Sequence, residues 1–271
     1  MITMAKVLRT VEAGRLRYAV LYDRYSPADP PRARAEKQRA SSAARQALNM
    51  RTSCQRLECL LFSNFGRDDW LVTLTYDDAH LPANWEAAIK QAKKFIRTLR
   101  EHRRPRDQPL RYVYVTEDKH GDGRVHHHMV VNGTGEDMET FRSLWTNGIV
   151  LMQNLRPREF PALARYLTKE PREYGRVDVG ARNWSASRGL AKAVAPPAEI
   201  VPDILTLQAP PGAYILENEG TMVNEFGNYQ FIKYLMPDQE DYRVPLEVST
   251  DPELDLTPWR YAPERRKRKT A

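Results

Sequence analysis

The chain has 271 residues, with 42 basic and 35 acidic side chains that give a formal net charge of +7. This balance favours a polyanionic partner, and nucleic acid is preferred over a membrane. Two cysteines, Cys54 and Cys59, exclude a disulfide framework and a cysteine zinc site, and no apolar run reaches membrane-spanning length. We therefore expect a cytoplasmic protein with reduced thiols, folded as one large domain or as a core with appendages.

Residues 1–66 are predicted to form an N-terminal extension that is helical and basic. Residues 15–22 are compatible with a strand, and the composition becomes helical from Ala33 to Phe62. The first part of this helix is polar on all sides, which is typical of a solvated helix, although a basic arm that binds phosphates has the same pattern. The second part can pack through an apolar stripe of Cys54, Leu57, Leu60 and Leu61.

Residues 67–175 show the pattern of a compact core. A β-rich strand at 69–76 is followed by Asn84, which can cap an amphipathic helix that runs to about Arg104. Two strands at 111–117 and 124–131 flank a loop with Asp-Gly, which indicates a hairpin. A helix at 136–147, a strand at 148–153 and a helix with Pro161 in its first turn complete the core.

This order of elements predicts an α+β fold. A β-α-β-β-α-β succession is the ferredoxin-like arrangement, a central antiparallel sheet with helices packed on one face. The two hairpin strands would lie near the centre of the sheet. The opposite face would be free for a substrate.

Three consecutive histidines lie in the second hairpin strand. Alternation along a strand places His126 and His128 on one face and His127 on the other, among apolar residues. If Glu117 pairs with Arg124, Glu117 shares the face of His126 and His128, whereas a one-residue slip replaces it by Thr116. Two imidazoles and one carboxylate suit a divalent cation. The other interpretations are a solvated histidine run and a hairpin-end carboxylate in water.

The last helix of the core carries Tyr166 and, three residues later, Lys169. A tyrosine hydroxyl keeps its proton near neutral pH, so it becomes a useful nucleophile only when a metal polarises the electrophile and a cation stabilises the developing charge. By itself the Tyr-x-x-Lys pattern is more often surface amphipathicity. Its position after the histidine strand favours a catalytic role.

Three segments, 71–76, 123–128 and 166–169, together resemble the HUH endonuclease superfamily, and more narrowly the rolling-circle replication initiators of small single-stranded DNA phages and plasmids. The resemblance implies that His126, His128 and Glu117 hold Mg²⁺ or Mn²⁺. It also implies that Tyr166, supported by Lys169, attacks single-stranded origin DNA, which leaves a 5′-phosphotyrosine and a 3′-hydroxyl primer. We expect further DNA contacts from Thr73, Thr75, Arg124 and Arg165.

Two positions depart from the pattern that the resemblance implies. The middle position of the histidine motif is normally apolar, and here it is His127, which either packs as a neutral ring or becomes a ligand in a shifted register. Tyr174 lies beyond the helix-stopping Pro171 and is a doubtful second nucleophile. An enzyme with one tyrosine needs a second subunit, or reuse of its site, to end replication.

Residues 176–271 are expected to form a C-terminal extension packed on the core, with a disordered basic tail at 262–271. No helicase-type phosphate loop occurs, so a host helicase and polymerase are the expected partners in a bacterial cytoplasm. Relaxases and transposases share the proposed chemistry. The rival hypothesis is a non-catalytic single-stranded DNA-binding protein in which Tyr112 and Tyr114 stack on bases.

Overall fold

The computed structural model describes residues 5–23, 43–117, 124–168, 184–202, 204–224 and 227–237. The chain divides into two units, Met1–Pro237 and Asp238–Ala271, and every described residue lies in the first. The predictions for Lys169, Tyr174, the hairpin loop and the basic tail therefore fall outside the described residues.

One antiparallel sheet forms the core of residues 70–186. Its strands are β3 (Trp70–Leu74), β4 (Tyr112–Glu117), β5 (His126–Val131), β6 (Val150–Asn154) and the short β7 (Ser185–Ala186), in the order β6-β3-β5-β4-β7. The helices α2 (Trp85–Arg103) and α3 (Asp137–Leu144) follow β3 and β5 along the chain. This is the predicted β-α-β-β-α-β succession, with the histidine strand β5 between β3 and β4, and it confirms the α+β class.

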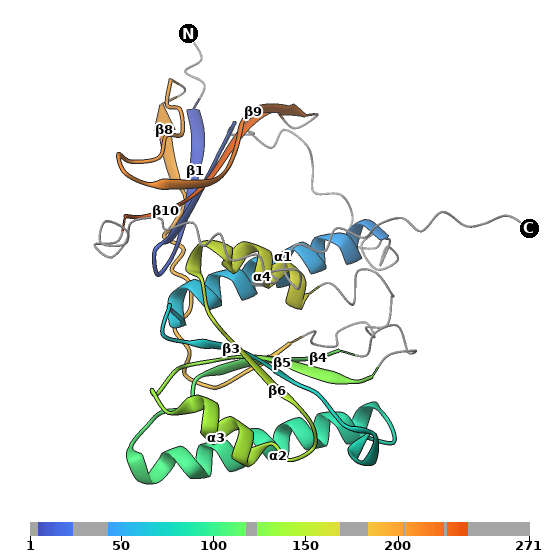
Figure 1. The fold of residues 1–271 in the computed structure, drawn as a ribbon. Helices are drawn as coiled ribbons and strands as arrows, with labels where there is room; N and C mark the ends of the chain where they lie inside the picture. The colour runs from blue at the N-terminus through green and yellow to red at the C-terminus, as the bar shows by residue number, and fades with distance from the viewer. Residues whose placement is uncertain are drawn as a thin grey trace, which may run out of the picture. The chain divides into compact units, whose positions relative to one another are not determined.

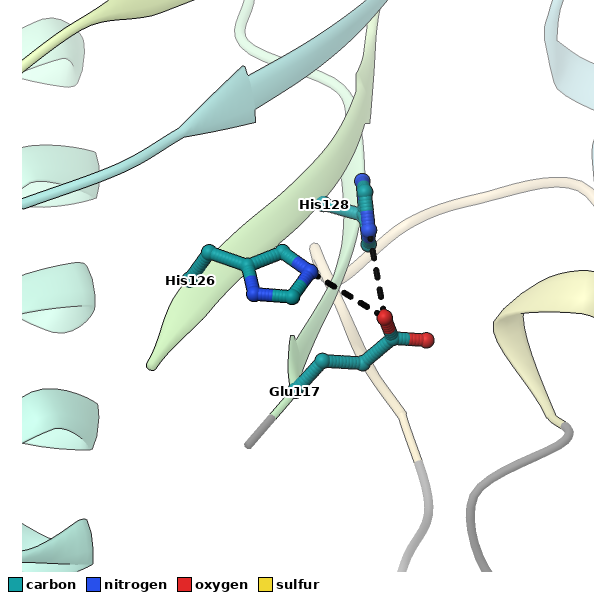
Figure 2. Close-up of side chains that lie close together, drawn as sticks. All are labelled: Glu117, His126 and His128. Atoms are coloured by element: carbon teal, nitrogen blue, oxygen red, sulfur yellow. Dashed lines mark hydrogen bonds and ion pairs between the residues drawn. The ribbon is translucent and has the colours of Figure 1, made fainter. Parts of the chain in front are cut away.

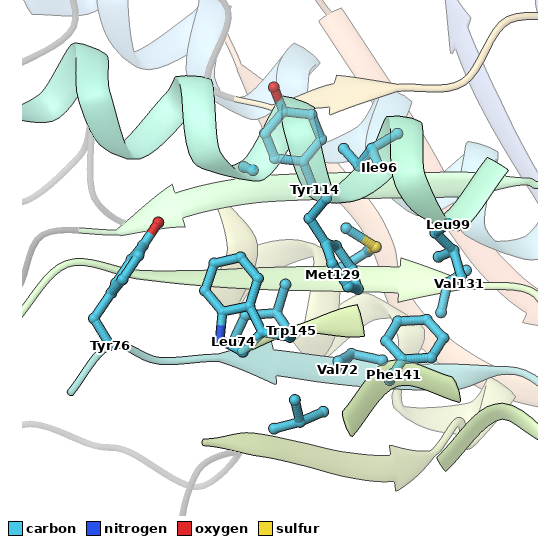
Figure 3. Close-up of a cluster of buried hydrophobic side chains, with 13 residues drawn as sticks. Val72, Leu74, Tyr76, Ile96, Leu99, Tyr114, Met129, Val131, Phe141 and Trp145 are labelled. Atoms are coloured by element: carbon cyan, nitrogen blue, oxygen red, sulfur yellow. The ribbon is translucent and has the colours of Figure 1, made fainter. Parts of the chain in front are cut away.

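Helices α2 and α3 pack on one face of this sheet (Figure 1). The amide of Ala87 donates to Asn84 Oδ1, which caps α2 as predicted. The buried residues of α2 recur at helical spacing, so one stripe of the helix faces the sheet. Their partners include Val72, Leu74, Met129 and Val131, which alternate along β3 and β5 (Figure 3).

The opposite face of the sheet is not free, in contrast to the expectation from the sequence. Helix α1 (Ala43–Asn64) and helix α4 (Phe160–Leu167) lie on that side (Figure 1). They pack against each other because both have apolar stripes, and the rings of Phe62 and Phe160 are 5.0 Å apart, centroid to centroid. Any substrate must therefore reach the sheet beside α4.

A buried ion pair joins the end of α2 to the start of α3. Arg103 donates to Asp137 at 2.8 Å, and both side chains are almost fully buried. Burial raises the pKa of Asp137, but hydrogen bonds from Thr134 and the charge of Arg103 outweigh burial and hold that pKa below its usual value. The pair is thus ionised and hydrogen-bonded, which is the condition for burying two charges.

Both ends of the described chain meet in a second antiparallel sheet. Strands β1 (Ala5–Ala13) and β2 (Leu16–Asp23) pair with β8 (Glu199–Pro202), β9 (Tyr214–Asn224) and β10 (Gly227–Leu235), in the order β8-β1-β2-β10-β9. The strand expected at 15–22 is confirmed, and residues 5–13 add a strand to a segment that we expected to be helical. The domain boundaries at 66 and 175 stay a prediction.

The second sheet contacts the C-terminal half of α1. Lys233 of β10 donates to Glu58 at 3.2 Å, and both side chains are largely buried. Gly14, with a φ of 55°, lies against the carbonyl of Phe62, where a Cβ atom would be 2.0 Å from the oxygen. Within the described ranges, none of the helices has the length and apolar character needed to cross a membrane.

Candidate metal centre

The histidine strand β5 sends its side chains to two different environments. His127 points into the α2/α3 side of the sheet and is 0% exposed. The hydroxyl of Tyr76 lies 2.7 Å from its Nε2 and that of Thr116 lies 2.9 Å from its Nδ1. Burial, with smaller contributions from the charges of His126 and His128, lowers the pKa of His127 to about 3. His127 is therefore a packed neutral ring, and the shifted register that would make it a ligand is wrong.

The pairing of β4 with β5 differs from the prediction by two residues. Glu117 lies opposite His126, and not opposite Arg124. A shift of two residues keeps every side chain on its face, because side chains alternate with a period of two. Glu117 thus shares the face of His126 and His128 as predicted, while Thr116 pairs with His127 on the other face.

Glu117, His126 and His128 form a compact cluster (Figure 2). One carboxylate oxygen, Oε2 of Glu117, lies 3.1 Å from His126 Nε2 and 3.3 Å from His128 Nε2. Each residue offers one ligand atom, and these atoms lie within 4.8 Å of one another. Glu117 and His128 are only 4% and 6% exposed, so the cluster is held inside the protein rather than on a solvated hairpin end.

The hydrogen bond on the far side of His126 indicates what the cluster can hold. His126 Nδ1 is 3.1 Å from the carbonyl oxygen of Arg124, and because a carbonyl only accepts, Nδ1 carries the proton. In the neutral ring this leaves a lone pair on Nε2, which faces the carboxylate oxygen. Two acceptors at this separation repel each other unless a proton or a metal cation lies between them. The donor set therefore fits a divalent cation.

Tyr166 reaches the same cluster from α4. Its hydroxyl lies 3.0 Å from His128 Nε2, and the two rings are arranged edge to face. Helix α4 is positioned by its apolar side, because Phe160, Leu163, Ala164 and Leu167 are all buried. Thr168 donates to the carbonyl of Ala164 where the helix ends. The half-buried Tyr166 is thus the hydroxyl that α4 presents to the candidate ligands.

The ligand candidates and Tyr166 lie in a segment that has a counterpart among known families. Residues 69–171 match the family of replication-associated proteins of the ORF2 type. The matched segment begins at β3 and extends past α4, so it contains the whole core sheet except β7, together with Glu117, both site histidines and Tyr166. No curated protein and no solved structure matches the chain.

The expected DNA-contacting residues of the segment that matches the replication-associated family have different surroundings. Thr73 lies at the cluster, with its hydroxyl 3.0 Å from His128 Nδ1, a contact that we did not predict. Thr75 donates to and accepts from the backbone of Ile149, so it fastens the chain before β6. The side chain of Arg124 pairs with Asp78, and Arg165 is exposed on α4. Thr73 is thus the expected DNA contact that lies against a candidate ligand.

The two tyrosines of the rival hypothesis are not arranged for base stacking. Tyr112 and Tyr114 lie on the α2/α3 side of β4, and Tyr114 is only 7% exposed. Both pack against the apolar core, with Tyr112 half-buried. The alternation of β4 determines this, since the same pattern that turns Glu117 to the cluster turns these rings inward. The expectation that they stack on bases is wrong.

Proposed function

We propose that the protein is a metal-dependent, site-specific nickase and strand transferase that acts on single-stranded DNA and initiates rolling-circle replication. The observation that carries the proposal is the Tyr166 hydroxyl at 3.0 Å from a histidine of the Glu117–His126–His128 cluster. A nucleophile beside a cation site is the arrangement needed for attack on a phosphodiester. The match to the replication-associated family supports a role in replication over relaxase or transposase activity.

In this proposal Glu117, His126 and His128 hold Mg²⁺ or Mn²⁺. When bound, the cation polarises the scissile phosphate and offsets the charge that develops on its oxygens. The Tyr166 oxygen forms a bond to phosphorus, and the bond from phosphorus to the 3′-oxygen breaks. Tyrosine loses its proton as this bond forms, and the departing 3′-oxygen gains one. The products are a 5′-phosphotyrosine and a free 3′-hydroxyl.

The reverse step joins DNA by the same chemistry. A 3′-hydroxyl attacks the phosphotyrosine, the new phosphodiester forms and Tyr166 is released with its proton. One phosphoester bond replaces another in each step, so cleavage needs no ATP. The free 3′-hydroxyl from the first step serves as a primer for a host polymerase, and a host helicase would separate the strands.

The proposal is tested with a pool of single-stranded DNA labelled at its 3′ ends, incubated with the protein and Mn²⁺ and separated on a denaturing gel. Attack by Tyr166 attaches the protein to the downstream fragment, so the 3′ label should migrate with the protein and a 5′ label should not. The linked band should disappear with a chelator and in Tyr166→Phe.

Tyr214→Phe is a matched control, because Tyr214 lies on β9 in the other sheet. This variant should retain the linked band. A linked band that persists in Tyr166→Phe would contradict the assignment of the nucleophile. DNA binding without any linked band and without Mn²⁺ binding would favour the non-catalytic alternative.

A further inference from the structure

Thr73 lies directly beside one of the two site histidines. In the antiparallel pairing of β3 with β5, Thr73 is opposite His128, and its Oγ1 is 3.0 Å from His128 Nδ1. On its other side, Thr73 is opposite Leu151 of β6, which offers no polar side-chain atom. The register of the sheet thus brings one hydroxyl to the ring nitrogen that points away from Glu117.

We propose that Thr73 is a positioning residue that holds His128 in the tautomer required for metal binding. This inference rests on the proposed metal site. Thr73 Oγ1 accepts the Nδ1 proton, so the lone pair of the neutral ring is on Nε2, which points to Glu117 and Tyr166. A neutral histidine in water carries its proton mainly on Nε2, where it blocks this ligand atom. The Thr73 hydroxyl opposes that preference and fixes the ring plane.

The two site histidines are therefore held by different kinds of acceptor. His126 Nδ1 donates to the backbone carbonyl of Arg124, which no side-chain substitution removes. His128 Nδ1 has a side-chain hydroxyl as its partner. Substitution of Thr73 can thus change the tautomer of one ligand while the other ligand, the carboxylate and the nucleophile keep their identities.

The first experiment measures the affinity of DNA-free protein for Mn²⁺ in three variants. Thr73→Val removes the hydroxyl and keeps the β-branched shape, and it should weaken Mn²⁺ binding by about 10- to 100-fold, the usual effect of losing an outer partner of a ligand. Thr73→Ser keeps the hydroxyl and should restore most of the affinity. Thr10→Val, the same substitution in β1 of the other sheet, should bind Mn²⁺ like the unmodified protein.

The second experiment reads the tautomer directly by NMR of metal-free protein with ¹⁵N-labelled histidine, in which the His128 signals are assigned by their loss in His128→Asn. The unmodified protein should show a proton on Nδ1 of His128, and Thr73→Val should move it toward Nε2. Unchanged Mn²⁺ affinity and an unchanged tautomer in Thr73→Val would overturn the inference. If no form binds Mn²⁺, the proposed metal site fails, and the tautomer still decides the role of Thr73.

Discussion

At the scale of single residues, the charge of Glu117 determines what the cluster can bind. Its Oε2 atom is close to the Nε2 atoms of both site histidines. We predict that Glu117→Gln, which keeps the shape and removes the charge, strongly weakens Mn²⁺ binding, because a hard cation gains most from a carboxylate oxygen. Calorimetric titration measures the effect. Glu101→Gln, on the exposed surface of α2, is the control, and equal affinities in the two variants would contradict a role for Glu117.

His127 should matter for stability and not for metal binding. In His127→Leu the hydroxyls of Tyr76 and Thr116 lose their buried partner. We expect the free energy of unfolding to fall by about 1–3 kcal/mol, the cost of leaving buried polar groups unsatisfied. Urea denaturation and Mn²⁺ titration of the same preparation separate the two roles. Lost Mn²⁺ binding at unchanged stability would show that His127 is a ligand after all.

At the scale of elements, the buried pair of Arg103 and Asp137 fixes α2 against α3. Asp137→Asn leaves the Arg103 charge buried without its counter-ion, so we expect a loss of about 3–5 kcal/mol of stability at neutral pH. Asp68→Asn, at an exposed position, should have little effect. A loss below about 1 kcal/mol, the range of surface pairs, would contradict the account.

The same pair gives a prediction for acid. The folded-state pKa of Asp137 lies below its usual value, so its ionised form stabilises the protein above the unfolded-state pKa. This stability is lost as the pH falls through the lower, folded-state pKa. Urea midpoints measured from neutral pH into acid should therefore converge for the unmodified protein and Asp137→Asn. A difference that stays constant over this range would mean that Asp137 titrates normally.

The elements of the core could be predicted because their signals are local. Alternation defined β3 and β5, Asn84 capped α2, and apolar spacing gave α4. The pairing of Glu117 with His126 could not be predicted, because the sequence of a Gly-rich loop does not determine how many residues it uses. The face of Glu117 was still correct, since only a shift by an odd number of residues would have changed it.

At the scale of the whole molecule, the second sheet and the Thr73 contact depend on distant parts of the chain. Strand β1 pairs with β8, and β2 pairs with β10, across nearly the whole described sequence. Alternation predicted several of these strands but not their partners, because partner choice depends on burial in the finished fold. The contact from Thr73 to His128 was missed for the same reason, since it needs the β3–β5 register.

The surface charge of the molecule gives a prediction for DNA affinity. Helix α2 packs on the face of the sheet opposite to Tyr166, and its exposed side carries Lys90, Lys93, Lys94, Arg97 and Arg100. Replacing Lys90, Lys94 and Arg97 by Gln should weaken sequence-independent DNA binding and reduce its salt dependence. The control replaces three other exposed cations, Arg67, Arg188 and Lys192. Equal losses in both variants would mean that only net charge matters.

The central claim is that Tyr166 becomes covalently linked to DNA. The most direct test is to isolate the protein–DNA adduct formed with Mn²⁺, digest both components and locate the modified residue by mass spectrometry. The account predicts a nucleotide attached through its 5′-phosphate to Tyr166, and no adduct in the presence of a chelator. Attachment to any other residue, or metal-dependent cleavage that leaves no nucleotide on the protein, would contradict it.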